Sequence, residues 1–138
     1  MTPLKLPGYR NLKVWQMGYE LAGLDYTVAR NFPAGHYRLV DQMTGAATSV
    51  YGNVGEGYCK NSLPHYIRSC DTARGELGEL IGYIHFCEEH GLIIGESAEK
   101  MNMLRNNLWP ALGGLIASLQ RKFEAGDWDT SLYPRKDT

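Results

Sequence analysis

The sequence predicts an all-α domain of four helices, and three observations lead to this fold class. Apolar residues recur at alternating spacings of three and four along most of the chain, which places them on single faces of helices. The length of 138 residues suits one domain with one core. We therefore expect a single domain over residues 1–126 and a tail without helical period at 127–138. Breaks containing proline and glycine divide the pattern into four expected helices, at about 11–30, 37–58, 63–90 and 96–124.

The first expected helix carries apolar residues on two faces. One row contains Leu12, Trp15, Tyr19, Ala22, Tyr26 and Ala29. The other row points roughly 150° away at about 100° per residue, and contains Val14, Met17, Leu21, Leu24 and Val28. No helix of a four-helix domain is central, so the second row favours coverage by another copy of the chain. The alternative is one wide core face with a few exposed apolar groups.

The stretch GNVGEG, residues 52–57, has the glycine content of a phosphate-binding loop but lies inside the second expected helix. A Rossmann motif or P-loop needs a preceding strand, and the P-loop also needs Gly-Lys followed by Ser or Thr. Neither is present, and the helical row before the glycines continues through them. We therefore expect these glycines to serve helix packing. The row contains Met43, Ala47, Val50, Val54 and Gly57.

A neighbouring row on the second helix is small or polar: Gln42, Ala46, Ser49, Asn53 and Glu56. Glu56 lies in the last turn, where the helix dipole disfavours a carboxylate, so a cation or amide donors should hold it. Arg74, Arg68 and the N–H groups of residues 61–63 are the candidates. We expect a polar clasp that fixes helix register or a subunit contact, formed by Gln42, Ser49, Asn53, Glu56 and Arg74. A catalytic or ligand-binding role for Glu56 is the alternative, although no second carboxylate or histidine at a suitable spacing completes a mechanism.

The third expected helix has the most regular core row, and its N-cap is expected at Ser62. The row contains Tyr66, Cys70, Ala73, Leu77, Leu80, Ile84 and Cys87. Nearly opposite lie Gly75, Gly78 and Gly82, each of which costs about 1 kcal/mol relative to alanine inside a helix. Three glycines on one line predict another backbone close to them, and simple tolerance of exposed glycines is the alternative.

The fourth expected helix is interrupted by Pro110, which cannot donate a hydrogen bond to the carbonyl of Asn106. A kink is expected there, or two short helices in place of one. Its apolar row contains Met101, Leu104, Leu108, Ala111, Leu115 and Leu119.

Four stretches together carry a family resemblance: YRNLKVWQ, QMTGAATSVYGNVGEG, ARGELGEL and LGGLIASL. In this order and spacing, from about Tyr9 to Leu119, the chain resembles the bacterial four-helix-bundle family named after the 23S ribosomal RNA intervening sequence. The most specific pattern is Gln-x-x-x-Ala-x-x-Ser-x-x-x-Asn-x-x-Glu-Gly, here Gln42, Ala46, Ser49, Asn53, Glu56 and Gly57. The resemblance implies an antiparallel up-down-up-down bundle that assembles into a closed homo-oligomer, with a pentamer typical of the family.

Some members of that family lie inside ribosomal RNA intervening sequences, and a similar bundle serves a retroelement reverse transcriptase and binds nucleic acid through basic surfaces. This chain has Thr44 and Gly45 where the family often has arginine, and only Lys60 where a basic run often follows Glu-Gly. The formal charge is −1, from 14 basic and 15 acidic residues. Both observations weaken nucleic-acid binding, because phosphate contacts need an excess of cations.

The remaining patterns predict no cofactor, no metal and no enzyme activity. No Glu-x-x-His pair is present for a di-iron site, and no nucleophile motif is recognisable. Three cysteines without a C-x-x-C pair, and no signal-like or membrane-spanning apolar run, favour a cytoplasmic protein. Tyr51 and Tyr58 are left as candidates for stacking on single-stranded bases. We expect a non-enzymatic assembly or partner-binding scaffold whose partners are its own copies and RNA, DNA or another protein, with no membrane; an RNA- or DNA-binding accessory is the alternative.

Overall fold

The computed structural model describes residues 8–126, in which every regular element is a helix and no strand is present. The all-α fold class with four helices is therefore confirmed, and the observed bounds lie within two residues of the expected ones. The tail expected at 127–138 lies outside the described residues. The elements are a short 3₁₀ helix η1 (Gly8–Asn11) and the helices α1 (Lys13–Ala29), α2 (Tyr37–Cys59), α3 (Leu63–Glu89) and α4 (Gly95–Ala125).

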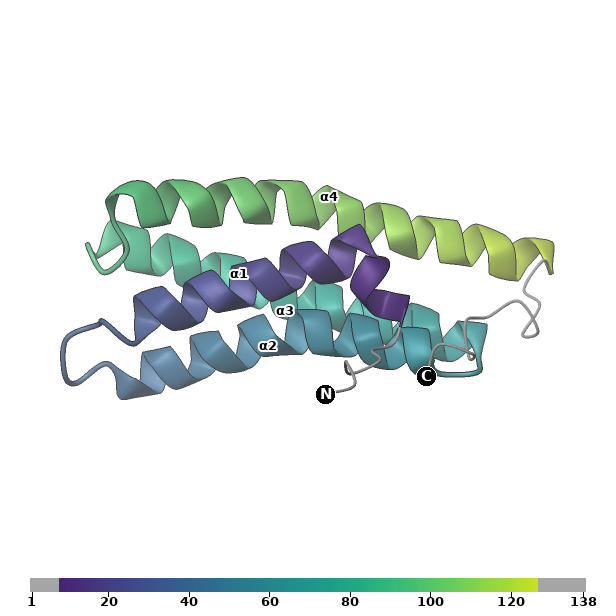
Figure 1. The fold of residues 1–138 in the computed structure, drawn as a ribbon, viewed down its shortest axis with the longest axis horizontal. Coiled ribbons are helices and arrows are strands. Elements are labelled where there is room, and N and C mark those ends of the chain that lie inside the picture. The colour runs from purple at the N-terminus through teal and green to yellow at the C-terminus, as the bar shows by residue number, and fades with distance from the viewer. Residues whose placement is uncertain (1–7, 127–138) are drawn as a thin grey trace, which may run out of the picture.

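The four α-helices lie side by side along the long axis of the molecule (Figure 1). The α1–α2 and α3–α4 connections lie at one end and the α2–α3 connection lies at the other. Each helix packs on the next in the chain, and α4 also packs on α1, so the helices enclose one core. Within residues 8–126 none of the helices combines the length and the apolar character needed to cross a bilayer.

The core is lined by the apolar rows that the sequence predicts for α2 and α3. All seven core positions expected on α3, from Tyr66 to Cys87, are buried, and so are all five on α2. Ser62 is the N-cap of α3, because its Oγ accepts a hydrogen bond from the backbone N–H of His65 at 3.4 Å. The helix ends where Gly91 adopts a φ of 71°. There the backbone N–H groups of Gly91 and Leu92 donate to the carbonyls of Glu88 and Cys87, which is a Schellman motif.

The packing of α1 corrects the expectation of two separate apolar faces. Val14 and Leu21 belong to the second row, which was expected to face another copy, but both are buried in the chain's own core. Tyr19 and Tyr26, which belong to the first row, are exposed. The buried face lies between the two rows, because Gly18 and Asp25, which an apolar count omits, also point inward. The alternative of one wide core face flanked by exposed apolar groups therefore describes α1 within the chain.

The stretch GNVGEG lies inside α2, as its helical spacing predicts, and two of its glycines are buried. A Cβ atom on Gly57 would lie 2.7 Å from Cβ of Ser69 and 3.0 Å from Cδ1 of Tyr66, both on α3. Gly57 therefore allows α2 and α3 to approach more closely than any larger residue would. On the other side of α2, a Cβ on Gly18 would lie 3.3 Å from Cβ of Tyr51, so α1 is also held close.

Pro110 lies inside a single continuous helix, so the alternative of two short helices is wrong. The α4 ribbon changes direction part-way along its length (Figure 1). Pro110 cannot donate to the Asn106 carbonyl, and both residues lie on the exposed side of the helix. The helix ends at Gly126, whose φ of 68° is the left-handed conformation that favours glycine.

Candidate functional site

The polar row of α2 lies along its junction with α3. Its side chains contact neighbouring turns of α2 and one side chain of α3. Asn53 Nδ2 donates to the backbone carbonyl of Ser49 at 2.8 Å, one turn earlier. Gln42 Oε1 accepts from the Tyr83 hydroxyl of α3 at 3.2 Å. Glu56 lies 3.9 Å from Lys60 Nζ. The side chains of this pair are 50% and 60% exposed, and an ion pair so open to water contributes at most about 1 kcal/mol.

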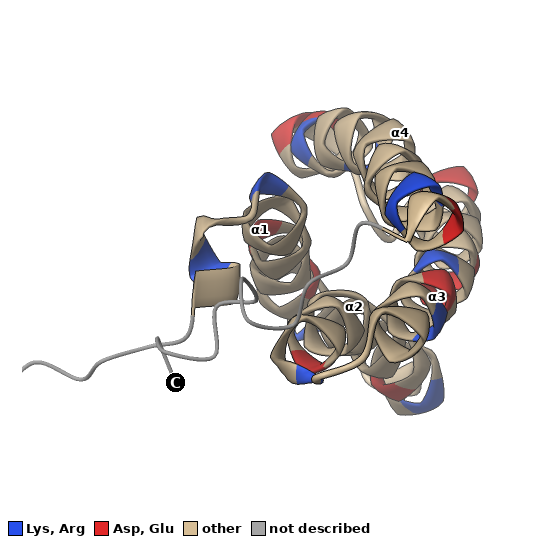
Figure 2. Cartoon of the chain, turned by 90° about the vertical axis from the view of Figure 1, so that its right-hand side faces the viewer, with Lys and Arg blue, Asp and Glu red and all other residues tan. Residues whose placement is uncertain are grey.

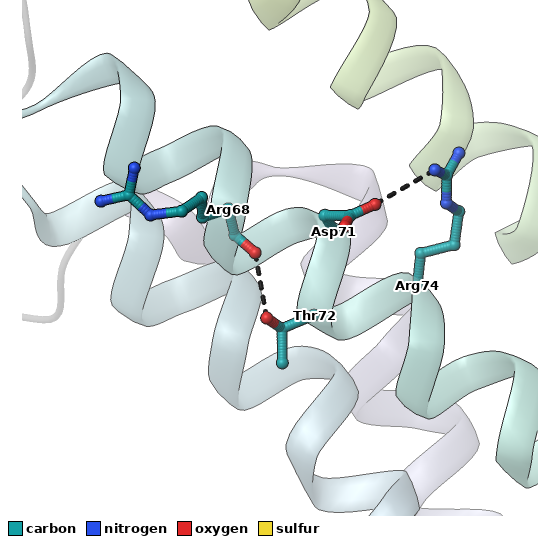
Figure 3. Close-up of polar contacts among 4 residues, drawn as sticks. All are labelled: Arg68, Asp71, Thr72 and Arg74. Carbon is teal, nitrogen blue, oxygen red and sulfur yellow. Dashed lines mark hydrogen bonds and ion pairs between the residues drawn. The ribbon is translucent and has the colours of Figure 1, made fainter.

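Glu56 and Arg74 do not meet within the chain, which corrects that part of the expected clasp. Arg74 Nη2 instead pairs with Asp71 Oδ1 at 3.1 Å, one turn earlier on α3 (Figure 3). Arg68 points away from this pair in the same view, and its backbone carbonyl accepts from Thr72 Oγ1 at 3.0 Å. The physical reason is local geometry: residues three apart on one helix are neighbours, so Asp71 reaches Arg74 without ordering a distant partner.

A shallow polar groove opens between the end of α2 and the start of α3. It has a volume of about 350 Å³, and its lining includes Asn53, Glu56, Lys60, His65 and Arg68. Cationic and amide donors stand beside a carboxylate here, an arrangement that can hydrogen-bond a mixed polar surface. The carboxylate opposes simple anion binding.

The glycine stripe of α3 faces outward. A Cβ placed on Gly75 or Gly82 would have no atom of the described residues within 4 Å, and a Cβ placed on Gly78 would lie 3.8 Å from the Trp109 ring of α4. No other backbone among residues 8–126 approaches these glycines closely, so the expected close packing is not found within the described part of one copy. Trp109 is itself 45% exposed. The surface of Gly75, Gly78, Gly82 and Trp109 is called the glycine face below.

An apolar groove separates α1 from α4, and its volume is about 720 Å³. Tyr19, Gly23 and Leu24 line it from α1, and Met103 and Leu104 line it from α4. Tyr19 is 54% exposed and Met103 60% exposed, although both are large apolar side chains. Glu20 and Lys100 also line this groove, which is called the α1/α4 groove below.

Charges of both signs are mixed over the surface. Figure 2 shows Lys or Arg segments close to Asp or Glu segments on both α3 and α4. Three of the ion pairs among the described residues join neighbouring turns at a spacing of four, including Glu96 with Lys100 at 3.4 Å and His85 with Glu89 at 3.5 Å. Neighbouring opposite charges cancel at a distance, so these helix surfaces provide little long-range attraction for a polyanion.

Tyr51 and Tyr58, the candidates for base stacking, belong to an aromatic cluster. Tyr51 meets Trp15 and Tyr19 edge-on, with ring centroids 5.8 and 5.2 Å apart. Tyr58 meets Tyr9 of η1 and Tyr66 of α3 at 6.2 Å. Tyr51 and Tyr58 are both half-buried by these contacts, which join η1, α1, α2 and α3. The cluster consists of Tyr9, Trp15, Tyr19, Tyr51, Tyr58 and Tyr66.

The sequence analysis missed one polar residue, Asp25 of α1, which is fully buried in the core. Its Oδ2 accepts a hydrogen bond from Thr44 Oγ1 of α2 at 3.3 Å, and its Oδ1 has no hydrogen-bond partner among residues 8–126. Burial raises the pKa of this carboxyl from 3.8 to about 6, against a smaller lowering by the Thr44 bond. The available signal was its position, because residues three and four away on both sides, including Leu21 and Ala29, are apolar.

The surroundings of the two buried thiols, Cys70 and Cys87, do not activate them. Burial raises the pKa of Cys70 to about 12, and burial together with the charge of Asp25 raises the pKa of Cys87 to about 11. Thiolates are the reactive form, so both cysteines are inert at neutral pH. Within residues 8–126, no three histidine, cysteine or acidic side chains lie close enough together to hold a metal ion.

Comparison with known proteins gives one family. The family model described as 23S rRNA-intervening sequence protein matches residues 10–114, which span the end of η1, all of α1, α2 and α3, and most of α4. No curated protein matches the chain.

Proposed function

Because the chain belongs to the 23S rRNA-intervening sequence protein family, we propose that it is a non-enzymatic scaffold that assembles from copies of itself and presents a symmetric surface to a partner. The observation that supports this most is the α1/α4 groove. Two large apolar side chains at its edges, Tyr19 and Met103, are more than half exposed in the isolated chain. Exposed apolar groups around a groove are typical of a protein–protein contact.

In this proposal the bundle is antiparallel, up-down-up-down, and the assembly is a closed ring of five copies. The alternation of the connections between the two ends of the molecule supports the topology (Figure 1). Two unlike faces support a ring, because a contact between different surfaces of neighbouring copies closes into a cycle when the rotation allows it. The α1/α4 groove and the glycine face are such a pair, since both include α4 but lie on different sides of it.

The polar row of α2 is the second part of the proposed interface. Gln42, Ser49, Asn53 and Glu56 are exposed or partly exposed, and their contacts leave amide and carboxylate groups that a neighbouring copy can bind. Arg74 is partly exposed on α3. A clasp between copies, in which Arg74 of one chain meets Glu56 of another, would use the two groups that do not meet within one chain.

Size-exclusion chromatography with light scattering tests the assembly. We expect a mass near five times 15.5 kDa for the wild type. Gly23→Leu places a side chain in the α1/α4 groove, and Gly78→Leu places one on the glycine face, whereas Gly52→Leu is the matched control at an exposed glycine of α2. The first two substitutions should lower the mass and the control should not. A wild type with the mass of one chain would refute the proposal.

A nucleic-acid-binding accessory is the second candidate, and the polar groove with Lys60, His65 and Arg68 is the observation that favours it. Purification of the native protein at low and high salt separates the two functions. Nucleic acid that is retained at low salt and lost at high salt would support the second function, because each phosphate contact releases counterions. A co-purifying protein that stays bound at high salt would support the scaffold function, which we propose for the cytoplasm.

A further inference from the structure

Asp25 is a buried acid that neither the fold nor the proposed function explains. It lies on the inward face of α1 with 0% of its surface exposed, among the buried side chains Leu21, Ala22 and Ala29 of the same helix. A carboxylate has about four acceptor sites. Within the part of the chain that the structure describes, only Oδ2 has a donor, the Thr44 hydroxyl at a long 3.3 Å, and Oδ1 has none.

The elements packed around Asp25 supply no positive charge to it. From α2 it receives only the hydroxyl of Thr44, and from α3 it faces the thiol of Cys87, whose pKa the charge of Asp25 raises. No charged group of α2, α3 or α4 contributes to the pKa shift of Asp25, and within residues 8–126 no lysine, arginine or histidine forms an ion pair with it. The ionised carboxyl is therefore both buried and unpaired.

Such a group is tolerated in its protonated form and strongly disfavoured in its ionised form. Protonation removes the charge and converts one oxygen into a donor, whereas ionisation leaves a desolvated charge with one weak hydrogen bond. An ionised Asp25 is stabilised when it reaches water. The α1/α4 groove borders this part of α1, because Leu24 and Thr27, on either side of Asp25 in the sequence, line it.

We propose that Asp25 makes the packing of α1 proton-dependent: with the carboxyl protonated, α1 stays packed on α2 and α3, and loss of the proton favours an opened form in which Asp25 reaches water through the α1/α4 groove. The shape of the α1/α4 groove thereby depends on pH. Partner binding at this groove would be sensitive to the protonation of a residue that lies beneath it.

Hydrogen exchange of the α1 amides tests this coupling in the full chain. A carboxyl with a pKa of about 6 when packed and 3.8 in water should raise the opening equilibrium of α1 about tenfold between about pH 5 and about pH 7.5. Asp25→Asn is the matched control, because it keeps the shape and the hydrogen bond capacity but does not titrate. Dividing the wild-type exchange by that of the variant at each pH removes the intrinsic effect of pH on exchange. The α3 amides of both proteins serve as an internal reference.

The expected result is an α1 opening that rises about tenfold in the wild type and stays constant in Asp25→Asn. Equal pH profiles in the two proteins would overturn the proposal. A second measurement covers a variant that fails to fold: ¹³C NMR titration of the Asp25 carboxyl in the wild type. A midpoint near 6 with α1 amide shifts that follow it supports the switch, and a midpoint near 4, or α1 shifts that do not follow, overturns it.

Discussion

The close contact of α2 with α3 at Gly57 gives the sharpest prediction about stability. Gly57→Ala adds one methyl group that would lie 2.7 Å from Cβ of Ser69. That Cβ is bonded directly to the α3 backbone and cannot rotate away, so the two helices must separate locally. Gly52→Ala is the matched control, because it lies in the same helix and its added methyl group meets no atom within 4 Å.

The magnitudes follow from two opposing effects. Alanine gains up to about 1 kcal/mol over glycine in a helix interior, and this gain applies in full at Gly52. Forcing extra volume into a packed contact costs about 1–3 kcal/mol. At Gly57 the helical gain is reduced, because α2 ends two residues later at Cys59. We expect Gly52→Ala to stabilise the fold by about 1 kcal/mol and Gly57→Ala to destabilise it by about 1–2 kcal/mol.

Urea unfolding followed by circular dichroism at 222 nm measures both variants, with the slope of the transition checked against the wild type. A difference of about 2–3 kcal/mol between the two variants is expected from the two effects together. Equal stabilisation by both substitutions would refute the reasoning, because it would mean that α2 and α3 are not held at the distance that Gly57 permits.

Three further substitutions test other features by the same unfolding measurement. Asp25→Val should raise the free energy of unfolding by about 2–3 kcal/mol near neutral pH, from a pKa shift of 3.8 to about 6. Since the pKa of Asp25 is raised in the folded protein, the stability that the protonated carboxyl contributes is complete below pH 3.8 and is lost as the pH rises through about 6. The gain in stability from Asp25→Val should therefore shrink in acid, and a gain that does not change with pH would contradict this. Pro110→Ala should stabilise α4 by about 1–3 kcal/mol by restoring a donor to the Asn106 carbonyl, and an unchanged stability would show that the kink is required. Ser62→Ala should cost about 0.5–1 kcal/mol, the low end for an N-cap because its hydrogen bond to His65 is 3.4 Å long; no loss would show that the cap is not formed in solution.

The sequence was sufficient for the helices because the periodic rows of α2 and α3 lie on single faces. Every residue in the α3 row from Tyr66 to Cys87 is buried, so spacing alone located that core. The same count divided the core face of α1 into two, since it scores apolar residues only. Gly18 and Asp25 occupy the centre of that face, and a glycine or an aspartate adds nothing to an apolar count.

The candidate site was less predictable, because hydrogen bonds depend on which neighbour is nearest in space. The row from Gln42 to Glu56 was visible as a pattern. The spacing of three between Asp71 and Arg74 made their contact possible, but the sequence does not decide which of several possible partners the Arg74 side chain takes. Close packing by glycine was expected on both α2 and α3. It is found on α2, where Gly57 meets Ser69, and at Gly18 of α1, which meets Tyr51, but not at Gly75 or Gly82 of α3. In the sequence, a glycine at a helix contact cannot be told from a glycine that faces solvent. Only the tertiary structure distinguishes the two.

The aromatic cluster gives this bundle an intrinsic optical signal for the position of its first helix. Trp15 is buried and stacked on Tyr19 at 4.9 Å, in a fixed asymmetric environment that produces near-ultraviolet circular dichroism. Trp109 is far more exposed, so a water-soluble quencher such as iodide removes its fluorescence first. Emission that survives the quencher then includes the indole of Trp15, and a change in its wavelength records movement of the first helix without any attached dye.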